Sequence, residues 1–348
     1  MRCEHGGYVY ENDISLDFSV NISPLGVPES VVNAAKKAAG DCERYPDPFC
    51  GELTKRLALL WGVSENRILC GNGAADLIFR TVNAVKPKKA VIAAPCFSEY
   101  KKALLSAGCE ITEHRLDESA DFRLDGSIAD KLDEDTDMLI LCSPNNPTGR
   151  LIDSELLKRI SRICEEKHIC FLLDECFAGL SDDDRGCVFP AEYEGGYTIL
   201  LRAFTKLYAM PGLRLGYAVF ASEELCRRSF ESGQYWSVSN IAQAAGAAAL
   251  SETGYVRKVR GMIPGERRYL SEGLRSLGMK VYPSDANFIL FRSELPLYDG
   301  LLKKGILIRD CFGFTGLDGS FYRTAVRKRE ENELLLAALE DIVKWQKK

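Results

Sequence analysis

Residues that could do chemistry follow directly after short apolar runs at four places in the sequence. They are the aromatic ring of Phe97, the amide of Asn146, the carboxylate of Asp174 and the amine of Lys206. If each run is a strand of one parallel sheet, these groups meet at its carboxyl edge, where open α/β sheets bind ligands. The sequence therefore predicts one site that contains all four groups.

The four groups match the requirements of pyridoxal 5′-phosphate (PLP). A lysine amine forms a Schiff base with this cofactor and then moves protons as a general base. A carboxylate keeps the pyridine nitrogen protonated, so that the ring can accept electrons from a substrate carbanion. An aromatic face stacks on the ring, and an amide can bond to its phenolic oxygen.

The phosphate of this cofactor needs backbone N–H groups at the start of a helix, together with a cation. Gly71–Gly73, followed by Ala74 and Ala75, precedes an apolar helical stretch and is a suitable cradle. Thr205 and Arg214 could add a hydroxyl and a guanidinium.

The apolar runs before these groups predict a parallel sheet wrapped by helices. The runs alternate with amphipathic helical stretches and lie at residues 90–94, 138–142, 169–173, 198–201 and 215–220. Continuous apolar runs of this length are typical of strands that are buried on both faces. Two helices are expected before the first run, at residues 28–40 and 50–61.

The last third of the chain has a different pattern, which predicts a smaller α+β domain. A long helical region, three strand-like runs and a terminal helix are expected there, at residues 240–277, 288–291, 306–308, 321–326 and 330–346. We therefore expect a large PLP-binding domain at 41–245 and a small domain at 246–348. Residues 1–40 should pack with the small domain or with a partner subunit.

Composition and charge restrict the class of protein. The chain has 348 residues and a net charge of −5, so binding to nucleic acid is not expected. Its 13 cysteines form no Cys-x-x-Cys pair and its three histidines are far apart, which favours free thiols in a reducing compartment and no metal site. With no signal pattern and no membrane-length apolar stretch, we expect a cytoplasmic protein.

In their order and spacing, the motifs resemble those of the class I/II aminotransferase superfamily over nearly the whole chain. The motifs that carry the resemblance are Gly71–Gly73, Ser143–Gly149, Asp174-Glu175, Thr205-Lys206 and Gly212–Gly216. The resemblance implies a PLP-dependent enzyme of fold type I. Such a fold has a large domain with a mostly parallel central sheet wrapped by helices, and a smaller α+β domain.

The resemblance also implies roles for single residues. Lys206 becomes the lysine of the Schiff base and Asp174 the partner of the pyridine nitrogen. Phe97 becomes the stacking ring and Asn146 the ligand of the phenolic oxygen. The residues that would hold the cofactor phosphate are Ala74, Ala75, Thr205 and Arg214.

Two further residues take roles from the family, and two depart from its pattern. Tyr45 resembles the tyrosine that reaches the phosphate from the neighbouring subunit, which implies a homodimer with shared active sites. Arg323 resembles the arginine that binds the substrate carboxylate. Phe177 stands where many members have a tyrosine, and Ala203 stands where a hydroxyl residue is frequent. How these two changes affect the electronic properties of the cofactor ring is left open.

Two branches share these motifs: the threonine-phosphate decarboxylases of cobalamin synthesis and the histidinol-phosphate aminotransferases. Four further segments resemble the decarboxylases more, at residues 5–7, 16–26, 236–239 and 308–311. They imply that His5, Asn21 and Arg309 lie near the substrate, and that a small phosphorylated amino acid, L-threonine O-3-phosphate, loses its carboxylate. The alternative is transamination between histidinol phosphate and 2-oxoglutarate.

The motifs do not separate these two reactions. The bond that breaks is the one held perpendicular to the cofactor ring, and a small shift of the carboxylate-binding arginine selects it. A third hypothesis, a non-catalytic regulatory module with this fold, is disfavoured because the catalytic-type pattern begins near residue 1 and leaves no room for a DNA-binding segment.

Overall fold

A seven-stranded sheet forms the larger part of the computed structural model, which describes residues 5–181 and 195–346. The strand order is β2-β8-β7-β6-β5-β3-β4. The strands are β2 (Ile68–Gly71), β3 (Lys89–Ala94), β4 (Glu110–Arg115), β5 (Met138–Cys142), β6 (Cys170–Asp174), β7 (Thr198–Ala203) and β8 (Gly216–Phe220). Neighbouring strands from β4 to β7 pair in parallel, whereas β8 is antiparallel to both β7 and β2.

The five runs that the sequence predicts as strands are all strands of this sheet. The expectation that the run at 215–220 is parallel to the others is wrong. The segment between β7 and β8 contains only one helical turn (Phe204–Leu207) and one 3₁₀ turn (Pro211–Leu213). It has no longer helix of the kind that usually crosses back to a parallel neighbour. Strand β4 escapes prediction because its residues are polar and partly exposed at the edge of the sheet.

Alternating side chains of the central strands enter two separate apolar clusters. Val91 and Leu139 belong to one cluster, and Ile92 and Ile140 to the other. Both faces of the sheet are therefore buried, which explains why its strands read as continuous apolar runs. The helices of this part are α1 (Glu29–Ala38), α2 (Gly51–Trp61), α3 (Ala74–Val85), α4 (Ser98–Ser106), α5 (Ser154–Glu166), α6 (Phe204–Leu207), α7 (Glu223–Glu231) and α8 (Asn240–Ala249).

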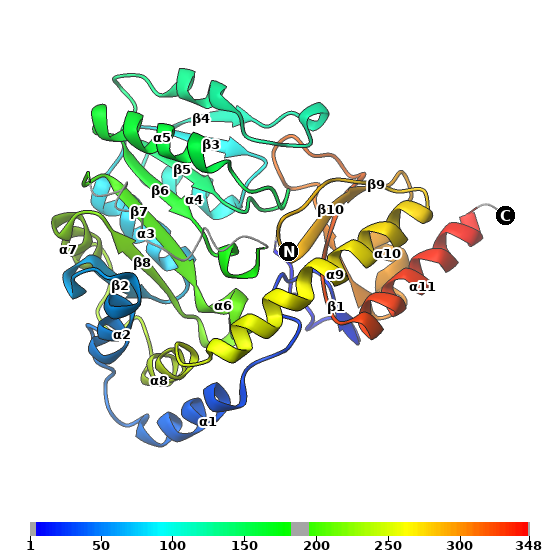
Figure 1. The fold of residues 1–348 in the computed structure, drawn as a ribbon, viewed down its shortest axis with the longest axis horizontal. Coiled ribbons are helices and arrows are strands. Elements are labelled where there is room, and N and C mark those ends of the chain that lie inside the picture. The colour runs from blue at the N-terminus through cyan, green and yellow to red at the C-terminus, as the bar shows by residue number, and fades with distance from the viewer. Residues whose placement is uncertain (1–4, 182–194, 347–348) are drawn as a thin grey trace.

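The C-terminal part has an antiparallel sheet of four strands, in the order β12-β13-β10-β9. These are β9 (Lys280–Val281), β10 (Phe288–Arg292), β12 (Arg309–Asp310) and β13 (Phe321–Ala325). Helix α9 (Thr253–Ser276) runs from the large sheet towards this small sheet, and α10 (Leu297–Leu302) and α11 (Arg329–Gln346) lie beside it (Figure 1). The helical region expected at 240–277 is thus two helices, α8 and α9.

The first part of the N-terminal segment joins the C-terminal part, whereas α1 packs against α8 of the large part, so the expectation for residues 1–40 is only partly met. Strand β1 (Leu16–Asp17) pairs in parallel with β11 (Ile306–Leu307), and Phe18 lies in one apolar cluster with Phe291 and Leu339. The run expected at 306–308 is strand β11 in its first two residues, and the separate strand β12 begins after Ile308 and pairs with a different partner. The domain limits themselves stay a prediction. Within the described ranges, the helices are too short or too polar to cross a membrane.

Candidate active site

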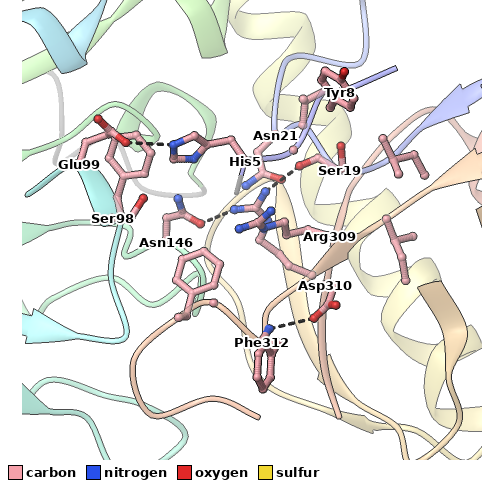
Figure 2. Close-up of a pocket in the computed structure, with 18 of the residues that line it drawn as sticks. His5, Tyr8, Ser19, Asn21, Ser98, Glu99, Asn146, Arg309, Asp310 and Phe312 are labelled. Atoms are coloured by element: carbon pink, nitrogen blue, oxygen red, sulfur yellow. Dashed lines mark hydrogen bonds and ion pairs between the residues drawn. The ribbon is translucent and has the colours of Figure 1, made fainter. Parts of the chain in front are cut away.

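A cavity of about 860 Å³ opens between the carboxyl edge of the large sheet, the small sheet and the N-terminal segment (Figure 2). This volume lies in the range of small-molecule sites. Many of the residues predicted for the site line the cavity: His5, Asn21, Ala75, Phe97, Asn146, Lys206, Arg214, Arg309 and Arg323. Residues from distant parts of the sequence therefore meet at one place, as expected from the strand ends.

The remaining predicted residues do not line the cavity. Asp174 is buried at the end of β6, and Thr205 is buried in α6. Ala74 is the first residue of α3. Tyr45 lies on the surface, 81% exposed, with its ring 4.8 Å from that of Trp236. The structure of one chain thus leaves Tyr45 outside its own site.

Lys206 lies in α6, the single helical turn that follows β7. Its Nζ atom is 5.5 Å from the centre of the Phe177 ring. Burial lowers the pKa of Lys206 to about 8, and the guanidinium groups of Arg323 and Arg214 act in the same direction. Because its pKa is lowered, a larger fraction of this amine is neutral near neutral pH than for an ordinary lysine, which makes it a potential nucleophile and general base.

Asp174 ends strand β6, and its carboxylate is buried. Tyr100 Oη donates a hydrogen bond of 2.6 Å to Oδ2, and the backbone N–H of Cys176 donates one of 2.9 Å to Oδ1. The carboxylate is near enough to Lys206 to oppose the fall of that lysine's pKa. The amine and the carboxylate of the prediction therefore lie in one electrostatic neighbourhood.

The start of α3 and the side chain of Arg214 form a potential phosphate cradle. Gly73 precedes α3 with a φ of 81°, and a Cβ there would lie 2.5 Å from Arg214 Nη2. Only glycine leaves this space to the guanidinium, which therefore lies beside the start of α3, where the first N–H groups of a helix have no acceptor within the helix. Dipole and cation together favour an anion at this position, so the residues fit the phosphate of PLP.

Arg323 is buried on β13, where burial lowers its pKa to about 10. Its Nη1 donates to Asn146 Oδ1, and its Nη2 donates to the Ser19 carbonyl oxygen at 2.7 Å. Asn21 Oδ1, in the amide orientation that satisfies both groups, accepts from Arg323 Nη1 and Nε at 3.2 Å. The guanidinium is thus bonded to Asn146, to Asn21 and to the main chain at Ser19.

Arg309 lies opposite Arg323 in the antiparallel pairing of β12 with β13. Its guanidinium is 5.4 Å from the centre of the Phe314 ring, and its charge contributes to the low pKa of Arg323. Two guanidinium groups on adjacent strands of one cavity repel each other. Such an arrangement is suited to a ligand that carries more than one anionic group.

His5 brings the N-terminal segment to the mouth of the cavity. Its Nε2 atom lies 2.9 Å from Glu99 Oε1 (Figure 2), and its ring centre lies 5.6 Å from that of Phe97.

The structure also shows where Phe177, one of the two departures from the family pattern, lies. Phe177 lines the cavity and packs edge-on against Phe288, so it offers no hydroxyl there.

Sequence reasoning missed two contacts of this site. It assigned no role to Tyr100, although Tyr100 follows Phe97 at the spacing that places two side chains on one helix face. It also missed the Ser19 carbonyl that holds Arg323, and no side-chain pattern could have indicated a main-chain acceptor.

Comparisons with known proteins show what the whole chain is similar to. A family model, "Aminotransferase class I and II", matches residues 13–339. The chain is 38% identical to the threonine-phosphate decarboxylase of Salmonella typhimurium over 97% of this chain and 96% of that protein. Among solved structures, the histidinol-phosphate aminotransferase of Clostridium acetobutylicum has 31% identity and a TM-score of 0.87, over 94% of this chain and 99% of that one. The L-threonine-O-3-phosphate decarboxylase of Porphyromonas gingivalis has 26% identity and a TM-score of 0.83, with the same coverage of 94% and 99%.

Proposed function

Because the chain belongs to the class I and II aminotransferase family, whose members are PLP-dependent enzymes, we propose that it decarboxylates L-threonine O-3-phosphate with PLP held on Lys206. The family, the fold class and the PLP-dependent type of enzyme that the motifs predict are confirmed by these matches. The specific reaction, the cofactor site and the residue roles are our proposal.

The observation that carries the proposal is the set of three arginines in one cavity. Arg214 lies at the phosphate cradle, and Arg323 is the carboxylate-binding candidate. Arg309 then supplies a further cation on the neighbouring strand. A substrate with both a carboxylate and a phosphate matches this arrangement, and L-threonine O-3-phosphate has both groups.

Lys206 and Asp174 would act on opposite ends of the cofactor ring. When bound, PLP accepts the electron pair that remains on the substrate Cα after a bond to that carbon breaks. Lys206, with its pKa of about 8, can attack a carbonyl carbon as a neutral amine and later hold or return a proton at Cα. Asp174 offers a buried anion to the ring nitrogen, Phe97 offers a stacking face, and Asn146 offers an amide to the phenolic oxygen.

The substrate would be oriented from the small sheet and the N-terminal segment. Arg323, held by Ser19, Asn146 and Asn21, can bind the carboxylate through its planar fork. Arg309 and His5 can bind the phosphate. Fixing both ends of the substrate would set which bond to Cα stands perpendicular to the ring, and the proposal requires this bond to be the one to the carboxylate.

A second candidate is transamination of histidinol phosphate, favoured by the 31% identity to a solved aminotransferase of that type. Histidinol phosphate carries a phosphate but no carboxylate. In that reaction, Arg323 would bind a carboxylate only when the keto acid or amino acid co-substrate occupies the site. The two arginines would then be used by different substrates rather than by one.

We further propose a homodimer in which Tyr45 reaches the phosphate cradle of the neighbouring copy. Tyr45, Phe49, Tyr235 and Trp236 are exposed aromatic residues that lie close together through ring contacts with one another and with Phe230. Aromatic residues of this kind are enriched in protein interfaces. A second copy of the chain that covers them would complete the site.

Two reactions with the purified protein and PLP test the function. The first contains L-threonine O-3-phosphate, and released carbon dioxide is measured; the second contains histidinol phosphate and 2-oxoglutarate, and glutamate is measured. The proposal expects carbon dioxide without glutamate. Glutamate without carbon dioxide would refute the decarboxylase proposal and support the aminotransferase instead. The Lys206→Ala variant should be inactive in both reactions.

A further inference from the structure

We propose that Tyr100 is a positioning residue, whose hydroxyl fixes the Asp174 carboxylate against the ring nitrogen of the cofactor. This inference rests on the proposed function, because it requires PLP in the cavity. Tyr100 itself does not line the cavity; it lies behind Asp174, 1% exposed, on helix α4.

The hydrogen bonds of Asp174 show how its orientation is set. Tyr100 Oη donates to Oδ2 at 2.6 Å, and Cys176 N donates to Oδ1 at 2.9 Å. Each oxygen therefore has a fixed donor, and rotation of the carboxylate breaks both of these bonds. Hydrogen bonds to a carboxylate are short and strong, and a buried one is costly to lose.

The chemical type of the donor suits the task. Burial, and then the charge of Asp174, raise the pKa of the Tyr100 phenol well above its usual range, so the hydroxyl stays protonated. A neutral phenol orients the carboxylate without cancelling its negative charge. A lysine or arginine in this place would compete with the protonated ring nitrogen for the same anion.

One turn of helix α4 supports two contacts of the proposed ring, the stacking face and the carboxylate at the ring nitrogen. Phe97, the N-cap residue of α4, lines the cavity, and Tyr100 lies three positions further along. Their rings meet edge to face, with centres 5.7 Å apart and planes at 84°. A shift of this turn would move the stacking face and the carboxylate together, so the contact couples their positions.

The test uses the Tyr100→Phe variant, which keeps the ring and loses the hydroxyl. We expect its dissociation constant for PLP, measured by absorbance titration, to rise about tenfold, as for other partners that orient a ligand-binding side chain. In the Asp174→Asn background, the same change should cause no further loss. Tyr282→Phe is the matched control, because Tyr282 Oη makes the same kind of bond, 2.5 Å to Glu118 Oε1, outside the cavity.

The outcomes separate this inference from the proposed function. Failure of the wild-type protein to bind PLP overturns the proposed function. Binding by the wild type, with equal affinity in Tyr100→Phe, overturns only the role of Tyr100. An equal loss in the Asp174→Asn background, or in the Tyr282→Phe control, shows a general packing effect and also overturns it.

A spectroscopic measurement keeps the inference testable if Tyr100→Phe does not fold. Replacing Tyr100 by 3-fluorotyrosine retains the shape of the ring and makes its hydroxyl a stronger donor. We expect the ¹⁵N chemical shift of the ring nitrogen in labelled PLP to move relative to the wild type. An unchanged shift would contradict a role that acts through Asp174.

Discussion

Replacing Arg309 by Gln should separate recognition of the substrate phosphate from the rest of the chemistry. Arg309 lies on β12 opposite Arg323, and it is the arginine that we assign to the phosphate. Charge-assisted hydrogen bonds contribute about 1.5–3 kcal/mol each. Because about 1.4 kcal/mol corresponds to a factor of ten, kcat/KM for L-threonine O-3-phosphate should fall about 10- to 150-fold.

The assay compares two substrates that differ only in the phosphate. With L-threonine, which lacks it, the Arg309→Gln variant should keep kcat/KM within about twofold of the wild type, because no phosphate contact is lost. Arg309→Lys should give an intermediate loss with the phosphorylated substrate, since lysine keeps the charge but not the fork. Arg292→Gln is the control: Arg292 ends β10, near Glu118 and outside the cavity.

The same variant makes an independent prediction about stability. The Arg309 charge contributes to the lowered pKa of Arg323, so its removal relieves a repulsion in the ligand-free protein. The midpoint of thermal unfolding should therefore change little, because this gain opposes the loss of the contact between Arg309 and the Phe314 ring. An equal loss of kcat/KM with both substrates, or a marked fall of this midpoint, would refute the assignment of Arg309 to the phosphate.

Other parts of the site give predictions of the same kind. Since Lys206 has a pKa of about 8, its amine is mostly protonated below that pH and mostly neutral above it. The rate at which the cofactor-free protein captures PLP, followed by stopped-flow absorbance, should therefore rise about tenfold from pH 6 to pH 7 and level off above pH 9. With an ordinary lysine the rate would continue to rise above pH 9. Gly73→Ala places a Cβ 2.5 Å from Arg214 Nη2 at a positive φ, so the dissociation constant for PLP should rise at least tenfold in an absorbance titration, and an unchanged value would contradict the cradle. Tyr45→Ala should weaken both self-association in sedimentation velocity and PLP retention on dialysis; a stable dimer with full retention would refute its proposed place in the neighbouring site.

The sequence predicts the site well where reactive side chains directly follow buried strands. Asp174 and Lys206 follow runs that are buried on both faces, and parallel strands bring their carboxyl ends to one edge. Local pattern and general geometry are therefore sufficient to place these groups together. The resemblance to the aminotransferases adds Arg323, which no local pattern indicates.

Contacts between distant side chains could not be predicted in this way. The bond from Tyr100 to Asp174 joins residues 74 positions apart, and that from Arg323 to Ser19 spans 304 positions. Their formation depends on how helices and sheets pack, which apolar periodicity does not encode. The direction of β8 was missed for a related reason, because strand order and orientation follow from the connections and not from the strand itself.

The pairing of β1 with β11 has a consequence for how the protein is made. Ser19 and Asn21, next to β1, bond with Arg323 near the opposite end of the chain. During synthesis, the ribosome releases the N-terminal segment long before β11 and β13 exist, so the segment has no partner for most of translation. The cavity can therefore form only after β13 has left the ribosome, because Arg323 on that strand joins the N-terminal segment to the site.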